Sequence, residues 1–201
     1  GYLPLLCTMN CTITTERIRA LFGYGVKELD REAARAPIGC EGITMLPYFT
    51  GERVPNLPGG KGVIAGLDLT NMKSENIARS ALESSVYALR GGLDAFISLG
   101  FEPKRIILTG GGAKSAIWRS IACDVMGLPL LVPSVGESAA FGAALQALWA
   151  LEGGSLSAIV ASHVVFDDGK ALMPDRESGR LYMDAYRRYQ RYVEAVSPLY
   201  R

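Results

Sequence analysis

The run Leu108-Thr-Gly-Gly-Gly-Ala-Lys-Ser-Ala-Ile-Trp118 decides how the rest of this sequence is interpreted. Residues 104–109 predict a short buried strand that leads into the run, and residues 113–126 predict a helix that follows it. Because glycine has no Cβ, the three glycines allow positive φ angles and let a flat ligand approach the backbone closely. A helix N-terminus adds free N–H groups and the positive end of the helix dipole. The run therefore predicts a place to hold a nucleotide.

The glycines alone do not decide between a nucleotide cradle and a tight connection from strand to helix. They do not form the Rossmann fingerprint, because no third glycine follows at the required spacing. They do not form a P-loop either, because Ala113 stands where the glycine before Lys114-Ser115 is needed. The choice depends on the rest of the chain.

Composition indicates one globular domain. The chain has 201 residues, of which 49% are apolar and 20% charged, and its net charge is +1. These values suit a sizeable core and do not indicate a nucleic-acid or membrane surface. Apolar stretches fall short of the ~18 residues that span a bilayer. The chain begins without methionine or a signal peptide, on an apolar stretch that predicts a helix, so we expect a piece of a longer protein.

The cysteines predict no metal site. Cys7, Cys11, Cys40 and Cys123 form no Cys-x-x-Cys pair, and His163 is the one histidine of the sequence. We expect reduced thiols in a cytoplasmic protein, and a strand-end position for the histidine rather than a catalytic role.

Periodicity predicts alternating helices and strands, consistent with a mixed sheet that has helices on its faces. The expected helices are residues 3–22, a short helix or turn at 31–36, a long helix that Ser74 caps and Gly100 and Pro103 end, 113–126, 138–149, one starting at 156–160, and a last one around 181–193. The expected strands are 43–48, 63–67, 104–109, 130–132 and an edge strand at 164–166. A Gly- and Pro-rich loop at 50–62 predicts a functional or disordered segment. The arginines of the last helix, Arg187, Arg188 and Arg191, predict a solvated face.

Two motifs, one of them within the glycine-rich run, carry a resemblance to a known family. Gly62-Val-Ile-Ala-Gly-Leu67, followed after eight residues by Asn76-Ile-Ala-Arg-Ser-Ala-Leu-Glu83, resembles the second signature of the FGGY carbohydrate kinases. Gly110-Gly-Gly-Ala-Lys-Ser115 with Trp118 resembles the adenosine-binding loop of that family. The match extends over nearly the whole chain.

Two neighbouring segments add to the resemblance. Glu137-Ser-Ala-Ala-Phe-Gly-Ala-Ala144 resembles the helix start that follows the adenosine loop in the family. Leu46-Pro-Tyr-Phe-Thr-Gly-Glu-Arg-Val-Pro55 is similar to a loop of the xylulokinases and their near relatives within it. These motifs therefore define the superfamily of the chain better than they define its sugar substrate.

The resemblance implies an α/β fold of the actin-like (ribonuclease-H-like) ATPase type, with residues 1–201 as the C-terminal domain of a two-domain kinase. It implies that this domain holds the adenosine half of ATP at Gly110, Gly111, Gly112, Ala113, Lys114, Ser115 and Ala116. Some members have an asparagine at the position of Ala116, so a base contact here has to come from backbone or a neighbour. Asn10 is a candidate neighbour of the phosphates.

Two elements of the family are missing from this chain. Neither the Asp-x-Gly-Thr phosphate loop nor the catalytic aspartate occurs, and Asp68, Asp124 and Asp168 do not match the context of that aspartate. No catalytic or metal-ligating residue is therefore assigned. We expect the isolated chain to bind nucleotide weakly and to turn over no sugar, because phosphoryl transfer needs a base and groups around the phosphates.

The implied function is ATP- and Mg²⁺-dependent phosphorylation of a sugar hydroxyl, with D-xylulose at its 5-hydroxyl as the first candidate. Gluconate, ribulose or a related polyol remains an alternative substrate. A non-catalytic actin-like binding module, and a plain α/β domain whose glycines form a turn, are the alternatives of another class. The expected partners are the sugar and ATP or ADP, with no nucleic acid or membrane. The resemblance also makes a homodimer an expectation.

Overall fold

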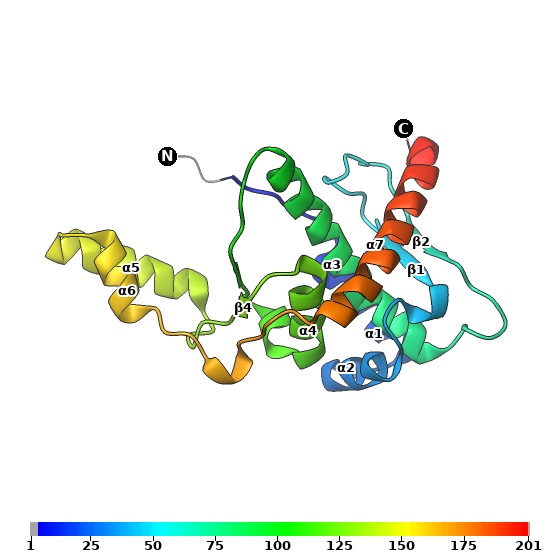
Figure 1. Ribbon diagram of the computed structural model, residues 1–201, viewed down its shortest axis with the longest axis horizontal. Helices are drawn as coiled ribbons and strands as arrows, with labels where there is room; N and C mark the ends of the chain where they lie inside the picture. Colours follow the sequence, from blue (N-terminus) through cyan, green and yellow to red (C-terminus); the bar gives the residue numbers. More distant parts are fainter. Residues whose placement is uncertain (1–3, 201) are drawn as a thin grey trace.

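The computed structural model describes residues 4–200. The helices in this range are α1 (Cys11–Phe22), α2 (Val26–Arg35), α3 (Ser74–Ser98), α4 (Ala116–Met126), α5 (Ser138–Glu152), α6 (Leu156–His163) and α7 (Arg176–Val196). The strands are β1 (Thr44–Pro47), β2 (Gly62–Ala65), β3 (Ile106–Ile107) and β4 (Leu130–Leu131). The described residues therefore combine helices and strands as expected, with helix predominating (Figure 1).

The strands of the described residues form two separate pairs instead of the single mixed sheet that was expected. β1 and β2 are antiparallel, with Thr44 opposite Ala65, and β3 and β4 are parallel, with Ile106 opposite Leu130. The expected strand at 104–109 is reduced to two residues, and it is not buried, since Ile107 is 48% exposed. The expected edge strand at 164–166 is reduced to one bridge between Phe166 and Pro133.

The core surrounds α3, which contacts α1, α2, α4, α7 and β1. Leu82 and Val86 of α3 are buried, together with Ile121 of α4 and Tyr182 of α7. All four residues of β1 are buried as well, because α3 and α7 both pack on this strand. The glycine-rich run leads directly into α4, and α4 packs in this core. The core therefore fixes the position of the candidate site.

The first two helices differ from the prediction. The predicted helix began at Leu3, which lies outside the described residues, and α1 begins at Cys11 because Met9 and Asn10 bond with the loop at 51–52 instead of with helical carbonyls. The short helix predicted at 31–36 is the end of α2, which starts earlier and buries Leu29 and Ala33 on one face.

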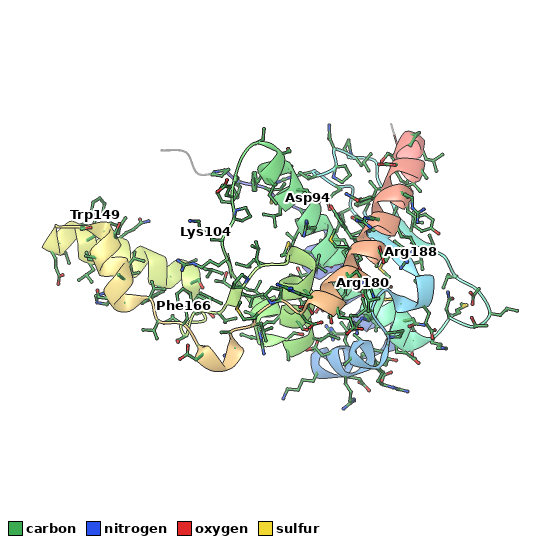
Figure 2. The ribbon with its side chains drawn as sticks, in the orientation of Figure 1. Asp94, Lys104, Trp149, Phe166, Arg180 and Arg188 are labelled. Carbon is green, nitrogen blue, oxygen red and sulfur yellow. The ribbon has the colours of Figure 1, made fainter. Side chains whose placement is uncertain are left out.

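Helices α5 and α6 form a hairpin that projects from the rest of the molecule (Figure 1). Leu145 of α5 and Ile159 of α6 are buried, whereas Trp149 and Leu151 are exposed. Figure 2 shows Trp149 near the end of the hairpin, far from Arg188 on α7. His163 is the last residue of α6, and its Nδ1 lies 2.9 Å from the Ile159 carbonyl oxygen, so the strand-end position predicted for it is wrong.

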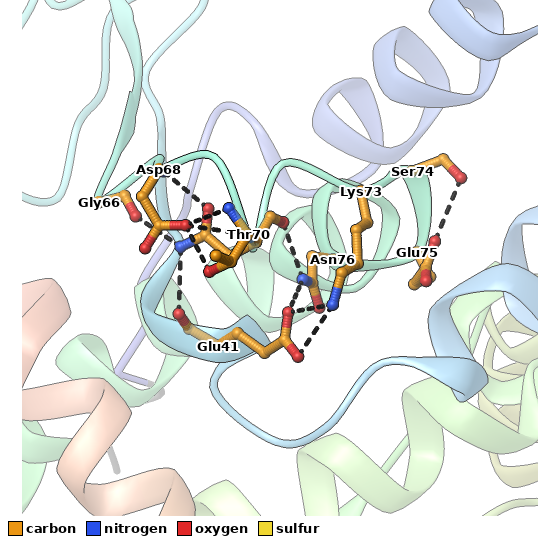
Figure 3. Close-up of polar contacts among 9 residues, drawn as sticks. Glu41, Gly66, Asp68, Thr70, Lys73, Ser74, Glu75 and Asn76 are labelled. Carbon is orange, nitrogen blue, oxygen red and sulfur yellow. Dashed lines mark hydrogen bonds and ion pairs between the residues drawn. The ribbon is translucent and has the colours of Figure 1, made fainter.

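The start of α3 is held by a polar network rather than by the predicted Ser74 cap (Figure 3). Ser74 is the first helical residue and makes no capping bond. Instead, Asn76 Nδ2 donates to Glu41 Oε2 at 2.7 Å and to the Asn71 carbonyl at 2.9 Å. Lys73 Nζ lies 2.8 Å from the same Glu41 carboxylate. Contacts from a distant segment therefore anchor this helix end.

One of the three arginines expected on a solvated face is structural. Arg188 donates from Nη2 to the Gly39 carbonyl at 2.9 Å and from Nε to Thr44 Oγ1 at 3.1 Å. The prediction was wrong here because α7 packs on β1 at this position. Arg187 and Arg191 are exposed, as expected.

Candidate functional site

The glycine-rich run forms a turn between β3 and α4. Gly110 has φ +79°, a conformation that favours glycine, and residues Gly111–Lys114 form one turn of 3₁₀ helix. The Ala113 N–H donates to the Gly110 carbonyl at 3.2 Å. The predicted helix at 113–126 therefore starts at Ala116, after this turn, because the tight backbone of the glycines favours the shorter repeat.

The turn is tied directly to α4. Ser115 is the N-cap, and its Oγ accepts a hydrogen bond from the Trp118 N–H at 3.2 Å. Arg119, in the first turn of α4, donates from Nη1 to the Ala113 carbonyl at 2.8 Å. These hydrogen bonds fix the position of the glycine turn relative to the first turn of α4.

A cavity of about 470 Å³ lies on one side of the turn. This volume falls within the ~300–1,000 Å³ that is usual for small-molecule sites. Gly111, Gly112 and Ser115 line one wall, with Trp118 beside them. A Cβ built on Gly112 would lie 3.0 Å from the Trp118 ring, whereas one built on Gly111 would meet open space. The backbone of Gly111 is therefore accessible from the cavity.

The opposite wall comes from residues that the sequence analysis did not propose. They share one face of α1 and the start of α2: Cys11, Thr12, Thr15, Glu16, Arg19, Val26, Leu29 and Asp30. The spacing of the α1 residues marks a helix face, but no pattern in the sequence shows that this face meets the glycine turn. Leu82 and Leu89 of α3 close the cavity together with Leu108.

The remaining candidate residues lie elsewhere. Gly110, Ala113 and Lys114 line a second, smaller hollow of about 90 Å³, which also includes Ser138 and Lys170. Ala116 lines neither space. The turn therefore divides the predicted adenosine-binding residues between two sides, and only the larger side has room for a nucleoside.

Charge in the larger cavity is largely paired. Arg19 Nη2 lies 2.5 Å from Glu16 Oε2, and this hydrogen bond lowers the pKa of the Glu16 carboxyl. Burial raises the pKa of the Cys11 thiol, and the charge of Glu52 adds to the effect. The cavity thus offers hydroxyls, a neutral thiol, one ion pair and the carboxylate of Asp30 around an apolar floor.

Asn10 precedes α1 as its N-cap residue, but its side chain does not face an open ligand site. It is 1% exposed, and its amide bonds with Thr50, Gly51 and Glu52. The first N–H groups of a helix have no intrahelical carbonyl to pair with, and those of α1 begin at Cys11, in the cavity wall. The side chain of Asn10 is therefore occupied by residues 50–52 and is not open to a ligand.

The three aspartates considered from the sequence lie outside the larger cavity. Asp68 Oδ1 accepts from the Thr70 N–H at 2.7 Å, and Asp124 Oδ1 accepts from the Asp175 N–H at 2.9 Å. Within residues 4–200, no His, Cys, Asp and Glu side chains come together in a group of three that could hold a metal ion. The helices of the same range include none with the length and apolar character to cross a membrane.

Comparisons with known proteins show which family the chain resembles. Residues 14–151 match the family model described as "FGGY family of carbohydrate kinases, C-terminal domain". The chain is 40% identical over 200 residues to the xylulose kinase of Haemophilus influenzae, which covers 100% of this chain and 40% of that protein. It is 35% identical over 124 residues to the gluconokinase of Bacillus subtilis, which covers 61% of this chain and 24% of that protein.

The crystal structure of xylulose kinase from Bifidobacterium adolescentis has the same fold over 92% of this chain and 36% of that chain, with a TM-score of 0.75 and 36% identity. This match confirms the fold class expected from the sequence. The chain spans only 40% of the length of the Haemophilus influenzae relative.

Proposed function

The chain belongs to the FGGY family of carbohydrate kinases, and we propose that it is the C-terminal domain of an ATP-dependent sugar kinase and supplies the adenosine half of its nucleotide site. One observation carries the proposal: the glycine turn and α1 face each other across a single cavity of about 470 Å³. Gly111 presents accessible backbone to it. A flat purine needs such a surface, because a side chain there would occupy its place.

The helix dipole orients the nucleotide in this cavity. Cys11 and Thr12 form the positive, N-terminal end of α1, and Glu16 and Arg19 lie further along the same face. Phosphates are stabilised at a helix N-terminus. We therefore place the phosphates toward Cys11 and the adenosine toward Glu16 and the glycine turn, where the carboxylate can accept hydrogen bonds from ribose hydroxyls or the base amino group.

ATP fits the described residues better than Mg²⁺ does. The acidic residues of the larger cavity are Glu16, already paired with Arg19, and Asp30. Mg²⁺ prefers several oxygen ligands together with substrate phosphates. The residues that the structure describes do not form such a set, and we assign no step of the reaction to a metal ligand among them.

The substrate we propose is D-xylulose, phosphorylated at the 5-hydroxyl. The relative that matches the whole chain is a xylulose kinase, and so is the structure at 36% identity. The match to a gluconokinase supports gluconate as the second candidate. The enzyme would act in the cytoplasm and bind sugar, ATP and ADP, and a homodimer remains part of the proposal.

We assign deprotonation of the sugar hydroxyl to none of the described side chains, because the two carboxylates of the larger cavity, Glu16 and Asp30, belong to the wall that we assign to the nucleotide. Asp124 and Asp68 bond with neighbouring backbone outside the cavity. A second domain would supply the base and close over the nucleotide, which excludes water and favours transfer to sugar over hydrolysis. The isolated chain should therefore bind nucleotide weakly and release no ADP in response to sugar.

The test is ADP release by the full-length protein that carries this chain, measured with D-xylulose, D- and L-ribulose, gluconate, glycerol and L-fuculose. Turnover restricted to D-xylulose supports the proposal, and preference for gluconate selects the second candidate. Nucleotide binding without turnover of any of these sugars would contradict the assignment as a sugar kinase and favour a non-catalytic actin-like module. Sugar-dependent ADP release by the isolated 201-residue chain would contradict the division of roles between two domains.

A further inference from the structure

The loop at residues 50–62 is fastened to the start of α1 by one buried carboxylate. Glu52 is 3% exposed. Its Oε1 accepts from the Met9 N–H at 2.7 Å and from the Arg53 N–H at 2.8 Å, and its Oε2 accepts from Asn10 Nδ2 at 3.1 Å. Two segments separated by about forty residues are thus joined at a single side chain.

Asn10 completes the connection from the other side. Its Oδ1 accepts from the Thr50 N–H at 3.2 Å and from Thr50 Oγ1 at 3.0 Å, and its Nδ2 also donates to the Gly51 carbonyl at 2.6 Å. These bonds fix which way the amide points, so Nδ2 has to face an acceptor at Glu52. We call Asn10 and Glu52, with the bonds between them and Thr50 and Gly51, the Asn10–Glu52 clamp.

The clamp acts directly on the first turn of α1. The Asn10 carbonyl accepts from the Thr14 N–H at 3.1 Å and also from Thr14 Oγ1. Cys11 and Thr12 follow immediately and line the larger cavity. Because misplacing a binding group by about 1 Å is enough to weaken its interaction severely, the position of this turn matters for any ligand it meets.

We propose that Glu52 is a positioning residue for the phosphates: through Asn10 it holds the first turn of α1 where its free amides meet them. This inference rests on the proposed function, because it assumes a nucleotide in the larger cavity. It also gives the loop at 50–62 a defined part in nucleotide binding. Adenosine, which lacks phosphates, should not depend on the clamp.

The experiment compares adenosine and ADP binding by calorimetry in the full-length protein that carries this chain, as wild type and as Glu52→Gln, with thermal unfolding recorded for each. Glutamine keeps the shape and one acceptor oxygen, but it turns an NH₂ group toward Asn10 Nδ2, so one bond is lost. We expect ADP affinity to fall about tenfold and adenosine affinity to change less than about twofold. Glu152→Gln, at an exposed position on α5, is the matched control and should change neither.

A second variant covers the case in which Glu52→Gln does not fold. Thr50→Val removes only the hydroxyl bond to Asn10 Oδ1 from the loop side, so it should give the same selective loss of ADP affinity, reduced in size. Equal losses for adenosine and ADP, or no loss for either, would overturn the positioning role while leaving the nucleotide site intact. Absence of binding of both ligands to the wild-type full-length protein would instead overturn the proposed function.

Discussion

Arg79 and Glu83, one turn apart on α3, form an ion pair in the interior of the protein, with Nε and Oε1 2.8 Å apart and side chains 9% and 3% exposed. The Glu83 carboxylate also accepts from the Gly39 N–H at 3.1 Å and from Tyr87 Oη at 2.9 Å. Arg79 Nη2 donates to Tyr182 Oη at 2.6 Å. The pair therefore joins α3 to α7 and to the turn that precedes β1.

Glu83→Ala should destabilise the fold strongly. Removing one partner leaves the Arg79 guanidinium buried without its counter-charge, which typically costs about 3–5 kcal/mol. Urea unfolding of the two proteins measures the difference in the free energy of unfolding. Asp184→Ala is the control, since Asp184 pairs with Arg187 at 3.3 Å on the surface, where such pairs contribute about 0–1 kcal/mol. A similar loss from both substitutions would contradict the structural role of the buried pair.

Arg188→Ala should also reduce stability, in contrast to its neighbours on α7. The substitution removes hydrogen bonds to the Gly39 carbonyl and to Thr44 Oγ1, and we expect a loss of about 1–3 kcal/mol. Arg191→Ala, at an exposed position, should change the free energy of unfolding by no more than about 0.5 kcal/mol. The comparison is made by denaturant unfolding, and equal effects of the two substitutions would refute the assignment.

Gly111→Val should weaken ATP binding without unfolding the chain. A Cβ at this position meets open space in the structure, and Gly111 lines the cavity that we assign to adenosine, so we expect a valine there to occupy part of that cavity. We expect ATP affinity to fall by at least about tenfold, because a close backbone approach is lost. Gly142→Val, where the Cβ is equally free on α5, is the control for nucleotide titrations. Unchanged ATP affinity in Gly111→Val would move the nucleotide away from this wall.

Asp124→Asn should stabilise the protein at neutral pH. Burial raises the pKa of the Asp124 carboxyl above its ordinary value of 3.8, and the charge of Asp175 adds to the rise. Between the ordinary and the raised value the folded state binds more protons than the unfolded state, so this group makes stability fall as pH increases. Asparagine removes the charge and keeps an oxygen for the Asp175 N–H.

The check is the melting temperature of Asp124→Asn and wild type over a pH series. The variant should melt higher at pH 7, and its advantage should shrink as the pH approaches 3.8. The exposed Asp184→Asn serves as the control. An advantage that stays constant with pH would show that the gain does not come from the charge of Asp124.

Much of the fold could be predicted from local pattern, because helices such as α3 and α7 repeat apolar residues along one face. Positions set by distant contacts could not. The start of α1 depends on Glu52, and the start of α3 depends on Glu41, which lies more than thirty residues away. Strand lengths also depend on distant partners: β3 pairs with β4, which lies more than twenty residues further along the chain, over only two residues.

The candidate site was only partly predictable. The glycine turn is a local motif, so Gly111, Gly112 and Ser115 could be found from the sequence, and the structure brings them to one wall. That Gly110, Ala113 and Lys114 line the other side depends on how the 3₁₀ turn rotates successive residues, which the motif does not show. The facing wall on α1 depends on tertiary packing and has no local signal.

The two tryptophans of the sequence occupy opposite environments, one under the glycine turn and one near the end of the projecting hairpin. Trp118 is 9% exposed and borders the larger cavity, whereas Trp149 is 43% exposed and donates from Nε1 to the Gly154 carbonyl at 3.0 Å. Replacing Trp149 with phenylalanine leaves a single indole emitter, placed where the purine would stack or displace solvent. If the nucleotide occupies the larger cavity as we propose, Trp118 fluorescence in this chain changes on binding and can follow occupancy without an attached dye.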